Sequence, residues 1–257
     1  ESGAYFMTAT VLVQTVTPEP TKTQVTFVLA GPRLITVRYA EPRAFSIFLA
    51  LCKRPDANLV NGSAVLIGLI EAIVDRLADF IERVQVEVDT LSKSIFGMRG
   101  STASRQRRFD ALLRSIGREG EMTSLVRESA YSLGRLLTFL THAANERKND
   151  KLIKDRIRTA ARDVQSLTDH IGFLSGKIVF LLDATLGMVS IQQNDIIKIF
   201  SIAAVVLLPP TLVASAYGMN FEFMPELKWF FGYPFALVLM VVSAVLPYLY
   251  FKRKGWL

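Results

Sequence analysis

The chain has 257 residues and a formal net charge of +7, from 30 Lys and Arg residues against 23 Asp and Glu residues. A single cysteine excludes an intramolecular disulfide framework, and only two histidines make a His-based catalytic metal site a poor fit. Hydrophobic residues make up 51% of the chain and the mean hydropathy is +0.32 although 21% of the residues are charged, which indicates apolar segments of the kind found in membrane proteins.

Residues 1–62 are predicted to form a β-rich region. Val, Thr, Phe and Ile alternate partially with polar residues over 5–16, 23–29 and 33–38, and Pro and Gly residues separate these stretches. This is too short for a complete sheet domain, so we expect it to be the incomplete part of a cytoplasmic αβ domain. Cys52 is predicted to be a packed thiol.

Residues 63–149 are predicted to form a cytoplasmic helical hairpin. After a turn and a capping residue at 61–63, apolar residues recur at helical spacing to about Phe96. A second helix is expected from about Arg105 to Asn145. His142 and His170 are predicted to be surface or packing residues.

The first of these helices carries an acidic stripe along one face. Its members are Glu71, Asp75, Asp79 and Glu82. One interpretation is a solvated face with helix pairs such as Asp79–Arg83. The other is a weak candidate for a regulatory Mg²⁺ site, because carboxylate clusters can hold a hydrated ion.

Two long uncharged runs lie near the C-terminus. A stalk helix over 150–198 has no strong breaker and leads into Ile199–Phe221, which has no charged residue over 23 positions. Trp229–Phe251 is equally free of charge over 23 positions. Because about 20 apolar residues span a bilayer core, we predict transmembrane helices over 199–217 and 229–251, joined by an external loop over 218–228.

The charges around these spans predict their orientation. Lys252, Arg253 and Lys254 begin a basic tail over 252–257, while the loop offers only Lys228 beside Glu222 and Glu226. The positive-inside rule then places both termini in the cytoplasm. The basic tail is interpreted as a topology and lipid-contact signal, or alternatively as an electrostatic collar around a pore mouth.

A stripe of small and mildly polar residues follows the first span at alternating spacings of three and four. Its members are Asn194, Ile197, Ser201, Ala204, Leu208, Thr211 and Ser215. The stripe favours two interpretations equally: a pore wall formed by several copies, with Ser and Thr hydroxyls supporting a hydrated ion, or a face for close helix packing. Pro209 and Pro210 remove two backbone donors and are expected to bend the span.

The residues after this helix resemble a known family. Tyr217-Gly218-Met219-Asn220, the following Met224-Pro225-Glu226-Leu227 segment and the ending Tyr250-Phe251-Lys252-Arg253-Lys254 are similar to those of the CorA family of magnesium and cobalt transporters. The resemblance is strong from about Asn194 to Leu257 and is carried by helix layout alone from about Gln24.

The resemblance implies an α+β membrane protein that forms a funnel-shaped homopentamer in the bacterial inner membrane, with a stalk helix that becomes the pore wall. It implies that Gly218, Met219 and Asn220 form an external selectivity filter. It also implies Mg²⁺ influx gated by intracellular Mg²⁺, with Co²⁺ and Ni²⁺ as further cations, and no catalytic cofactor or nucleic-acid partner.

The filter chemistry is reasonable for Mg²⁺. This ion dehydrates reluctantly, so neutral oxygens such as the Asn220 amide can read its water shell without the cost of removing it. Glu222 and Glu226 are expected to raise the local cation concentration, or else only to keep the loop soluble. An inside-negative potential favours inward flow, and no phosphate-binding loop for ATP is present in the sequence.

Three alternatives remain open at this stage. A relative that transports zinc or another divalent ion is the nearest, although Met219 argues modestly against zinc. A membrane-anchored receptor or scaffold is the alternative from another class. An enzyme has the least support, because the sequence shows no nucleophile elbow, His-base constellation or paired carboxylate cleft.

Overall fold

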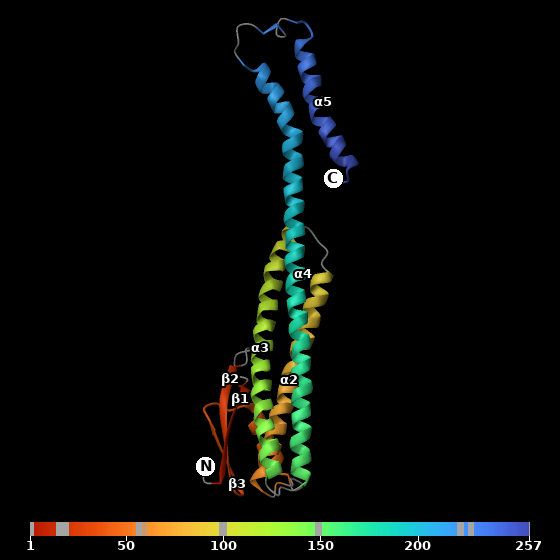
Figure 1. The fold of residues 1–257 in the computed structure, drawn as a ribbon. Coiled ribbons are helices and arrows are strands. Elements are labelled where there is room, and N and C mark those ends of the chain that lie inside the picture. Colours follow the sequence, from red (N-terminus) through yellow and green to blue (C-terminus); the bar gives the residue numbers. More distant parts are fainter. Residues whose placement is uncertain are drawn as a thin grey trace. The chain divides into compact units, whose positions relative to one another are not determined.

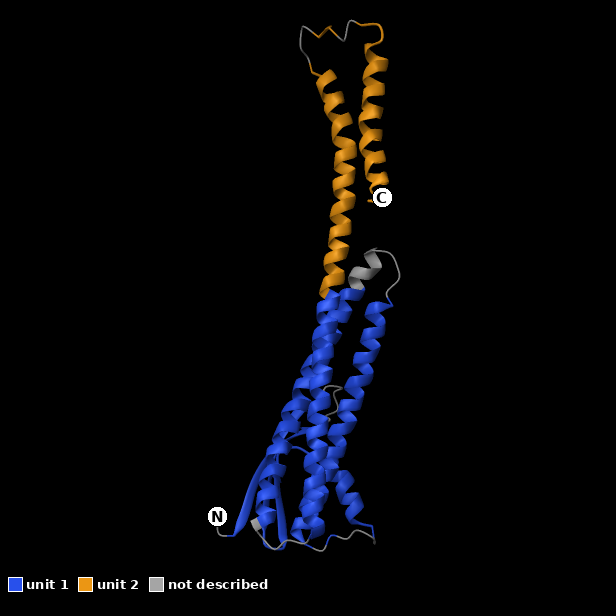
Figure 2. Cartoon of the chain, turned by 45° about the vertical axis from the view of Figure 1, so that its right-hand side comes forward, with its two compact units in different colours: residues 1–185 blue, residues 186–257 orange. Residues whose placement is uncertain are grey.

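The computed structural model describes residues 3–13, 21–54, 59, 61–97, 102–146, 151–219, 224–225 and 229–256, without the side chains of 102–107 and 146. The chain divides into two compact units, Glu1–Thr185 and Leu186–Leu257, here called the N-terminal and C-terminal units (Figure 2). Three strands are followed by long helices (Figure 1), which confirms the predicted α+β fold class with a long helix leading to a C-terminal apolar helix.

The strands form one antiparallel meander. β1 (Ala4–Val13), β2 (Thr21–Ala30) and β3 (Arg33–Arg38) are neighbours in chain order, with Ala4 opposite Ala30 and Val25 opposite Arg38. Side chains alternate across a sheet, so one face collects the buried apolar residues. These are Met7, Ala9, Val11 and Val13 from β1 and Val25, Phe27 and Leu29 from β2.

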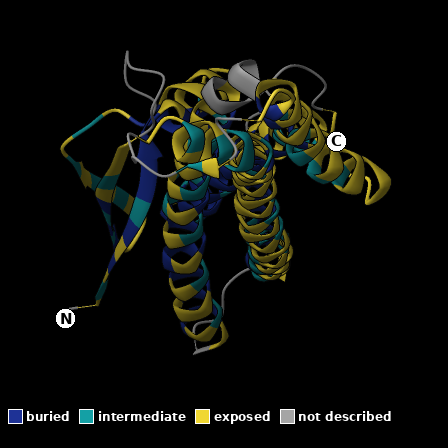
Figure 3. Ribbon diagram, turned by 90° about the horizontal axis from the view of Figure 1, so that it is seen from above, coloured by how far each residue is buried: buried dark blue, intermediate teal, exposed yellow. Residues whose placement is uncertain are grey.

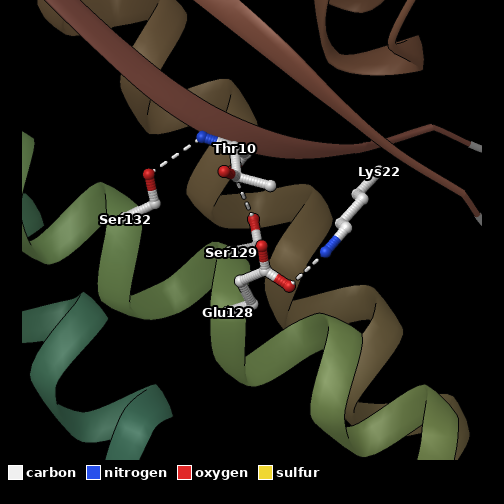
Figure 4. A network of polar contacts seen from close by, with 5 residues as sticks. All are labelled: Thr10, Lys22, Glu128, Ser129 and Ser132. Carbon is white, nitrogen blue, oxygen red and sulfur yellow. Dashed lines mark hydrogen bonds and ion pairs between the residues drawn. The ribbon is translucent and has the colours of Figure 1, made fainter.

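The outer edge of β1 is covered by helix α3 (Thr102–Glu146). The Thr10 backbone N–H donates to Ser132 Oγ at 2.9 Å, and Ser129 Oγ donates to the Thr10 carbonyl at 2.9 Å (Figure 4). Lys22 pairs with Glu128 at 2.7 Å beside them. An uncovered strand edge presents unpaired N–H and C=O groups, and the two hydroxyls satisfy these groups at Thr10.

A short helix, α1 (Arg43–Cys52), lies within the region predicted to be only β-rich. Its buried residues are Ala44, Phe45 and Phe48, and Arg38 stacks on the Phe45 ring at 4.2 Å. Cys52 is half-buried. Ten residues rich in Phe, Ile and Leu fit a strand as readily as a helix, which is why the pattern did not show this element.

Helix α2 (Gly62–Phe96) begins at an N-cap where the Asn61 side chain accepts a hydrogen bond from the Ala64 N–H at 2.9 Å. It ends at Gly97, whose N–H donates to the Lys93 carbonyl. One side of α2 is buried from Leu66 to Val88 and packs in the core of the N-terminal unit. Buried residues gather where the sheet and helices of this unit face one another (Figure 3).

Helix α4 (Lys151–Tyr217) has 67 residues and enters both units. In the N-terminal unit it buries a seam with spacings of three, four and seven. The seam consists of Ile153, Ile157, Ala160, Val164, Ile171, Leu174, Ile178, Leu181 and Thr185. Polar contacts to α2 run beside it: Arg156 to Glu71, His170 to Gln85 at 3.0 Å and Lys177 to Asp89.

We expect Ser132→Ala to lower the free energy of unfolding by about 1–3 kcal/mol, because it leaves the Thr10 N–H without its acceptor in a part-buried position. Ser124, an exposed serine on the same helix, provides the matched control. Ser124→Ala should change stability by less than about 0.5 kcal/mol in denaturant unfolding of the full chain. Equal effects of the two substitutions would show that the Thr10 contact does not stabilise the fold.

Candidate functional site

The C-terminal unit contains the last part of α4 and helix α5 (Gly232–Arg253). Both helices are long and apolar enough to cross a membrane, and only 6% of the most apolar stretch of each is buried within the chain. Phe200, Leu212 and Val241 are among the large apolar side chains left exposed. Water contact over such a surface is unfavourable, so this unit is suited to lipid and to further copies of the chain.

Each helix of this unit has one less exposed side. On α4 this side consists of Ile202, Val206, Pro209, Pro210, Val213 and Tyr217. On α5 it consists of Gly232, Ala236, Met240, Ser243, Ala244, Pro247 and Phe251. The two helices lie side by side (Figure 2), so each shields one side of the other.

The predicted stripe lies on the opposite side of α4. All seven residues are exposed: Asn194, Ile197, Ser201, Ala204, Leu208, Thr211 and Ser215. A helix turns by about 100° per residue, which puts the middle of the stripe roughly 160° around α4 from the side that α5 shields. The stripe therefore does not serve packing between the two helices of this unit.

α4 continues through Pro209 and Pro210, and its direction changes toward its C-terminal end (Figure 1). Neither proline has an N–H, so the carbonyls of Val205 and Val206, four residues earlier, lose their helical donors. The Thr211 hydroxyl donates to the Leu207 carbonyl at 2.7 Å just beyond. A hydroxyl that donates to a carbonyl on the preceding helical turn favours bending of the helix, which fits the bend predicted at this position.

The helix ends at the motif. α4 stops at Tyr217, the Gly218 N–H donates to the Ala214 carbonyl at 2.9 Å, and the Met219 N–H donates to the Ala216 carbonyl at 3.4 Å. A Cβ on Gly218 would lie 3.1 Å from the Ala214 oxygen, so any larger residue here would have to relieve a tight contact. The partial negative charge of a helix C-terminus is thus directed at the motif, where it favours a cation.

The other residues predicted for the filter, the external loop and the basic tail lie partly outside the described residues. Met219 is described and half exposed. Asn220, Glu222 and Glu226 fall outside the described residues. The basic tail is described, and Lys252, Arg253 and Lys254 are all exposed at the end of α5.

The acidic stripe of α2 is divided among different partners. Glu71 accepts a hydrogen bond from Arg156 Nε on α4 at 2.9 Å. Asp79 pairs with Arg76 at 2.6 Å, so the expected Asp79–Arg83 pair is wrong; Arg83 instead stacks on the Phe80 ring at 4.5 Å. Glu82 is exposed.

Within the acidic stripe, Asp75 is the residue whose carboxyl has a raised pKa. Burial raises its pKa above the ordinary value, and the neighbouring charges of Glu71, Asp79 and Asp163 raise it further. Asp163 lies on α4, so sequence periodicity within α2 did not reveal it as a neighbour. Over the described ranges, no three His, Cys, Asp or Glu side chains form a group that could hold a metal ion.

Comparison with known proteins gives the same assignment along nearly the whole chain. The family model described as "CorA-like Mg2+ transporter protein" matches residues 1–253. The magnesium transport protein CorA of Yersinia pseudotuberculosis is 41% identical over 236 residues, which cover 91% of this chain and 71% of the relative. That of Escherichia coli K12 is 40% identical over 235 residues, with the same coverage.

The fold is shared with a solved structure described as the complete structure of the CorA magnesium transporter from Methanocaldococcus jannaschii. The TM-score is 0.82 at 17% identity, over 100% of this chain and 78% of that one. The two apolar helices, the long α4 and the small sheet thus occur together with a family match over almost all residues. This chain belongs to the family of CorA-like Mg²⁺ transporters.

Proposed function

We propose that several copies of this chain, arranged as a homopentamer, form a channel for passive Mg²⁺ influx through the bacterial inner membrane. The observation that carries the proposal is the exposed stripe on the side of α4 turned away from α5. One pair of helices cannot enclose an aqueous path. A ring of copies places the seven stripe residues around a common axis and leaves α5 on the outside.

The stripe supplies what a hydrated cation path needs. The Ser201, Thr211 and Ser215 hydroxyls offer neutral oxygens to the water shell of the ion, and Asn194 adds an amide at the cytoplasmic end. Rings of Ile197 and Leu208 are narrow apolar zones that close by dewetting. Conduction and closure are thus assigned to different levels of one helix face.

Gly218, Met219 and Asn220 are assigned to the external selectivity filter. Five α4 C-termini directed at the motif attract a cation without a fixed charge that would hold it. Five Asn220 amides then read the hydrated ion. Glu222 and Glu226 raise the local cation concentration at the mouth, an effect that salt screens.

Both termini are assigned to the cytoplasm, because Lys252, Arg253 and Lys254 follow the second span. An inside-negative potential then drives a divalent ion inward by about 4.6 kcal/mol per 100 mV, twice the value for a single charge. Co²⁺ and Ni²⁺ follow the same path, since the filter reads the hydrated ion. Transport of Zn²⁺ in place of Mg²⁺ is the alternative within the same superfamily, and competition between the ions in uptake distinguishes them.

Gating by intracellular Mg²⁺ is assigned to the acidic residues between α2 and α4. Burial raises the pKa of Asp75, and the neighbouring negative charges of Glu71, Asp79 and Asp163 raise it further. A hydrated Mg²⁺ near these carboxylates relieves their repulsion and stabilises the packing of α4 on α2. Loss of the ion would weaken this packing and release α4.

Cysteine accessibility tests the pore stripe. In a Cys52→Ser background, Ser201→Cys and Ser215→Cys should react with a membrane-impermeant cationic thiol reagent, and the reaction should block most Mg²⁺ uptake in proteoliposomes. Val206→Cys and Val213→Cys, on the side shielded by α5, are the matched controls. Equal reaction on both sides, or reaction without block, would count against a pore along the stripe.

A second experiment tests the filter. Potential-driven Mg²⁺ uptake by proteoliposomes should fall severalfold or more in Asn220→Ala, because the ring of amide oxygens is lost. Asn145→Ala makes the same chemical change at an exposed position of α3 and should leave uptake unchanged. Unchanged uptake in Asn220→Ala would remove this residue from the filter, and no uptake by a folded, oligomeric parent would favour the receptor or scaffold alternative.

Asp75→Asn tests the acidic site through stability. The folded-state pKa of Asp75 is raised, so stability is lost as the pH rises from the unfolded-state pKa through the folded-state pKa, where the unfolded chain releases the proton more readily. The variant should be more stable than the parent at pH 7 without Mg²⁺. This difference in stability should vanish below about pH 4, where Asp75 is protonated in both the folded and the unfolded chain. Added Mg²⁺ should narrow the difference at pH 7.

The control for this comparison is Asp183→Asn, an exposed aspartate on α4, which should change the thermal midpoint little at any pH. A parent and an Asp75→Asn variant with equal midpoints across the pH range would show that Asp75 is not under electrostatic strain. A stability difference that stays the same when Mg²⁺ is added would show that the electrostatic strain at Asp75 is not linked to gating by Mg²⁺.

A further inference from the structure

Helix α5 ends in an ordered turn of the chain, here called the corner, which consists of residues 250–256. Gly255 has a φ of +69°, the Gly255 N–H donates to the Lys252 carbonyl at 3.2 Å, and the Trp256 N–H donates to the Phe251 carbonyl at 3.1 Å. These two bonds form a Schellman motif, which turns the chain back onto the last helical turn. The Trp256 ring accordingly stacks on Phe251, with centroids 5.4 Å apart and 24° between the planes.

The same corner carries three consecutive cations. Lys252, Arg253 and Lys254 are exposed, and the Lys254 ammonium lies 5.2 Å from the centre of the Tyr250 ring and 5.8 Å from that of Trp256. No described carboxylate pairs with any of the three, and the sequence from 229 to 257 contains no Asp or Glu. The positive charge of the corner is therefore uncompensated within its own helix.

Lys198 shows the contrast. It begins the other apolar span, on α4, but it pairs with Asp195 at 3.5 Å, three residues earlier on the same helix. A lysine with a carboxylate partner has less need of an external anion. The three cations of the corner have only the helix C-terminus, whose partial negative charge is diminished by the carbonyls already bonded to Gly255 and Trp256.

We propose that this corner, made of residues 250–256, binds the phosphate headgroup of an anionic phospholipid. Tryptophan and tyrosine rings favour the depth at which lipid headgroups meet the acyl chains, and the Tyr250 and Trp256 rings lie beside the Lys254 ammonium. Each Lys or Arg near an anionic leaflet strengthens binding by about fivefold. The guanidinium of Arg253 adds paired N–H donors that match phosphate oxygens.

A lipid is favoured over a free phosphate by the apolar half of the corner. Phe251 and Trp256 form a stacked apolar surface beside the cations, at the end of a helix whose other side chains are suited to the membrane interior. A free phosphate would use only the cations. A lipid uses the cations for its headgroup and the exposed Trp256 ring, which is stacked on Phe251, for its glycerol and upper acyl chain.

The full chain, reconstituted in vesicles of equal parts phosphatidylcholine and phosphatidylglycerol, is examined with spin-labelled forms of each lipid. The parent should hold phosphatidylglycerol in preference to phosphatidylcholine. The triple variant Lys252→Gln, Arg253→Gln, Lys254→Gln should lose this preference severalfold. Lys198→Gln, which removes one charge from the same unit, should keep it.

Gly255→Val tests the built corner separately from its charge. Valine is rarely found at positive φ, so the variant should open the cap, free Trp256 and reduce the preference while all three cations remain. An unchanged preference in the triple variant would overturn the proposal, and an unchanged preference in Gly255→Val would reduce it to non-specific charge. Loss of Mg²⁺ uptake by the triple variant in pure phosphatidylcholine, with lipid preference intact, would assign the cations to a pore collar instead.

Discussion

The apolar side chains of α4 are buried within the chain in its first part and exposed in its last part, and the division of the chain into two units follows from that difference. Up to Thr185 the helix buries a seam within the N-terminal unit, whereas from Leu186 onward most of its side chains are exposed. Surface of this kind is stable only in contact with lipid or with another protein surface. The C-terminal unit is therefore incomplete as a single copy, and any account of its function must say what covers each side of α4.

Three sides of α4 have three different characters in that unit. One is shielded by α5, the opposite one carries the mainly small and polar stripe, and large apolar residues such as Val205 and Leu207 lie between them. A packing role for the stripe within the hairpin is removed by this arrangement. Close packing against another copy and a water-filled path remain physically distinct, because a cysteine substituted at a position that faces water reacts with a polar thiol reagent and one at a packed position does not.

Much of this could be predicted from the sequence because it rests on local periodicity. Runs without charge mark both apolar helices, and spacings of three and four mark the stripe. The missing parts depend on contacts between distant residues. Glu71 meets Arg156 and Asp75 meets Asp163 across 85 and 88 positions, which one sequence cannot show. Arg83 stacks on the Phe80 ring and does not pair with Asp79, since an aromatic face and a carboxylate compete for the same guanidinium.

The two ends of the hairpin place different demands on the chain. At the end of α4, Gly218 lets the backbone turn close to the Ala214 carbonyl, and the Gly218 and Met219 N–H groups bond to the Ala214 and Ala216 carbonyls. At the end of α5, Gly255 turns the chain back through a Schellman motif, whose N–H groups bond to the Lys252 and Phe251 carbonyls. The last carbonyls of both helices are thus partly satisfied by backbone donors, so the backbone alone does not distinguish the two ends. The difference lies in the side chains: three exposed cations stand at the end of α5, whereas Gly218 and Met219 at the end of α4 are uncharged.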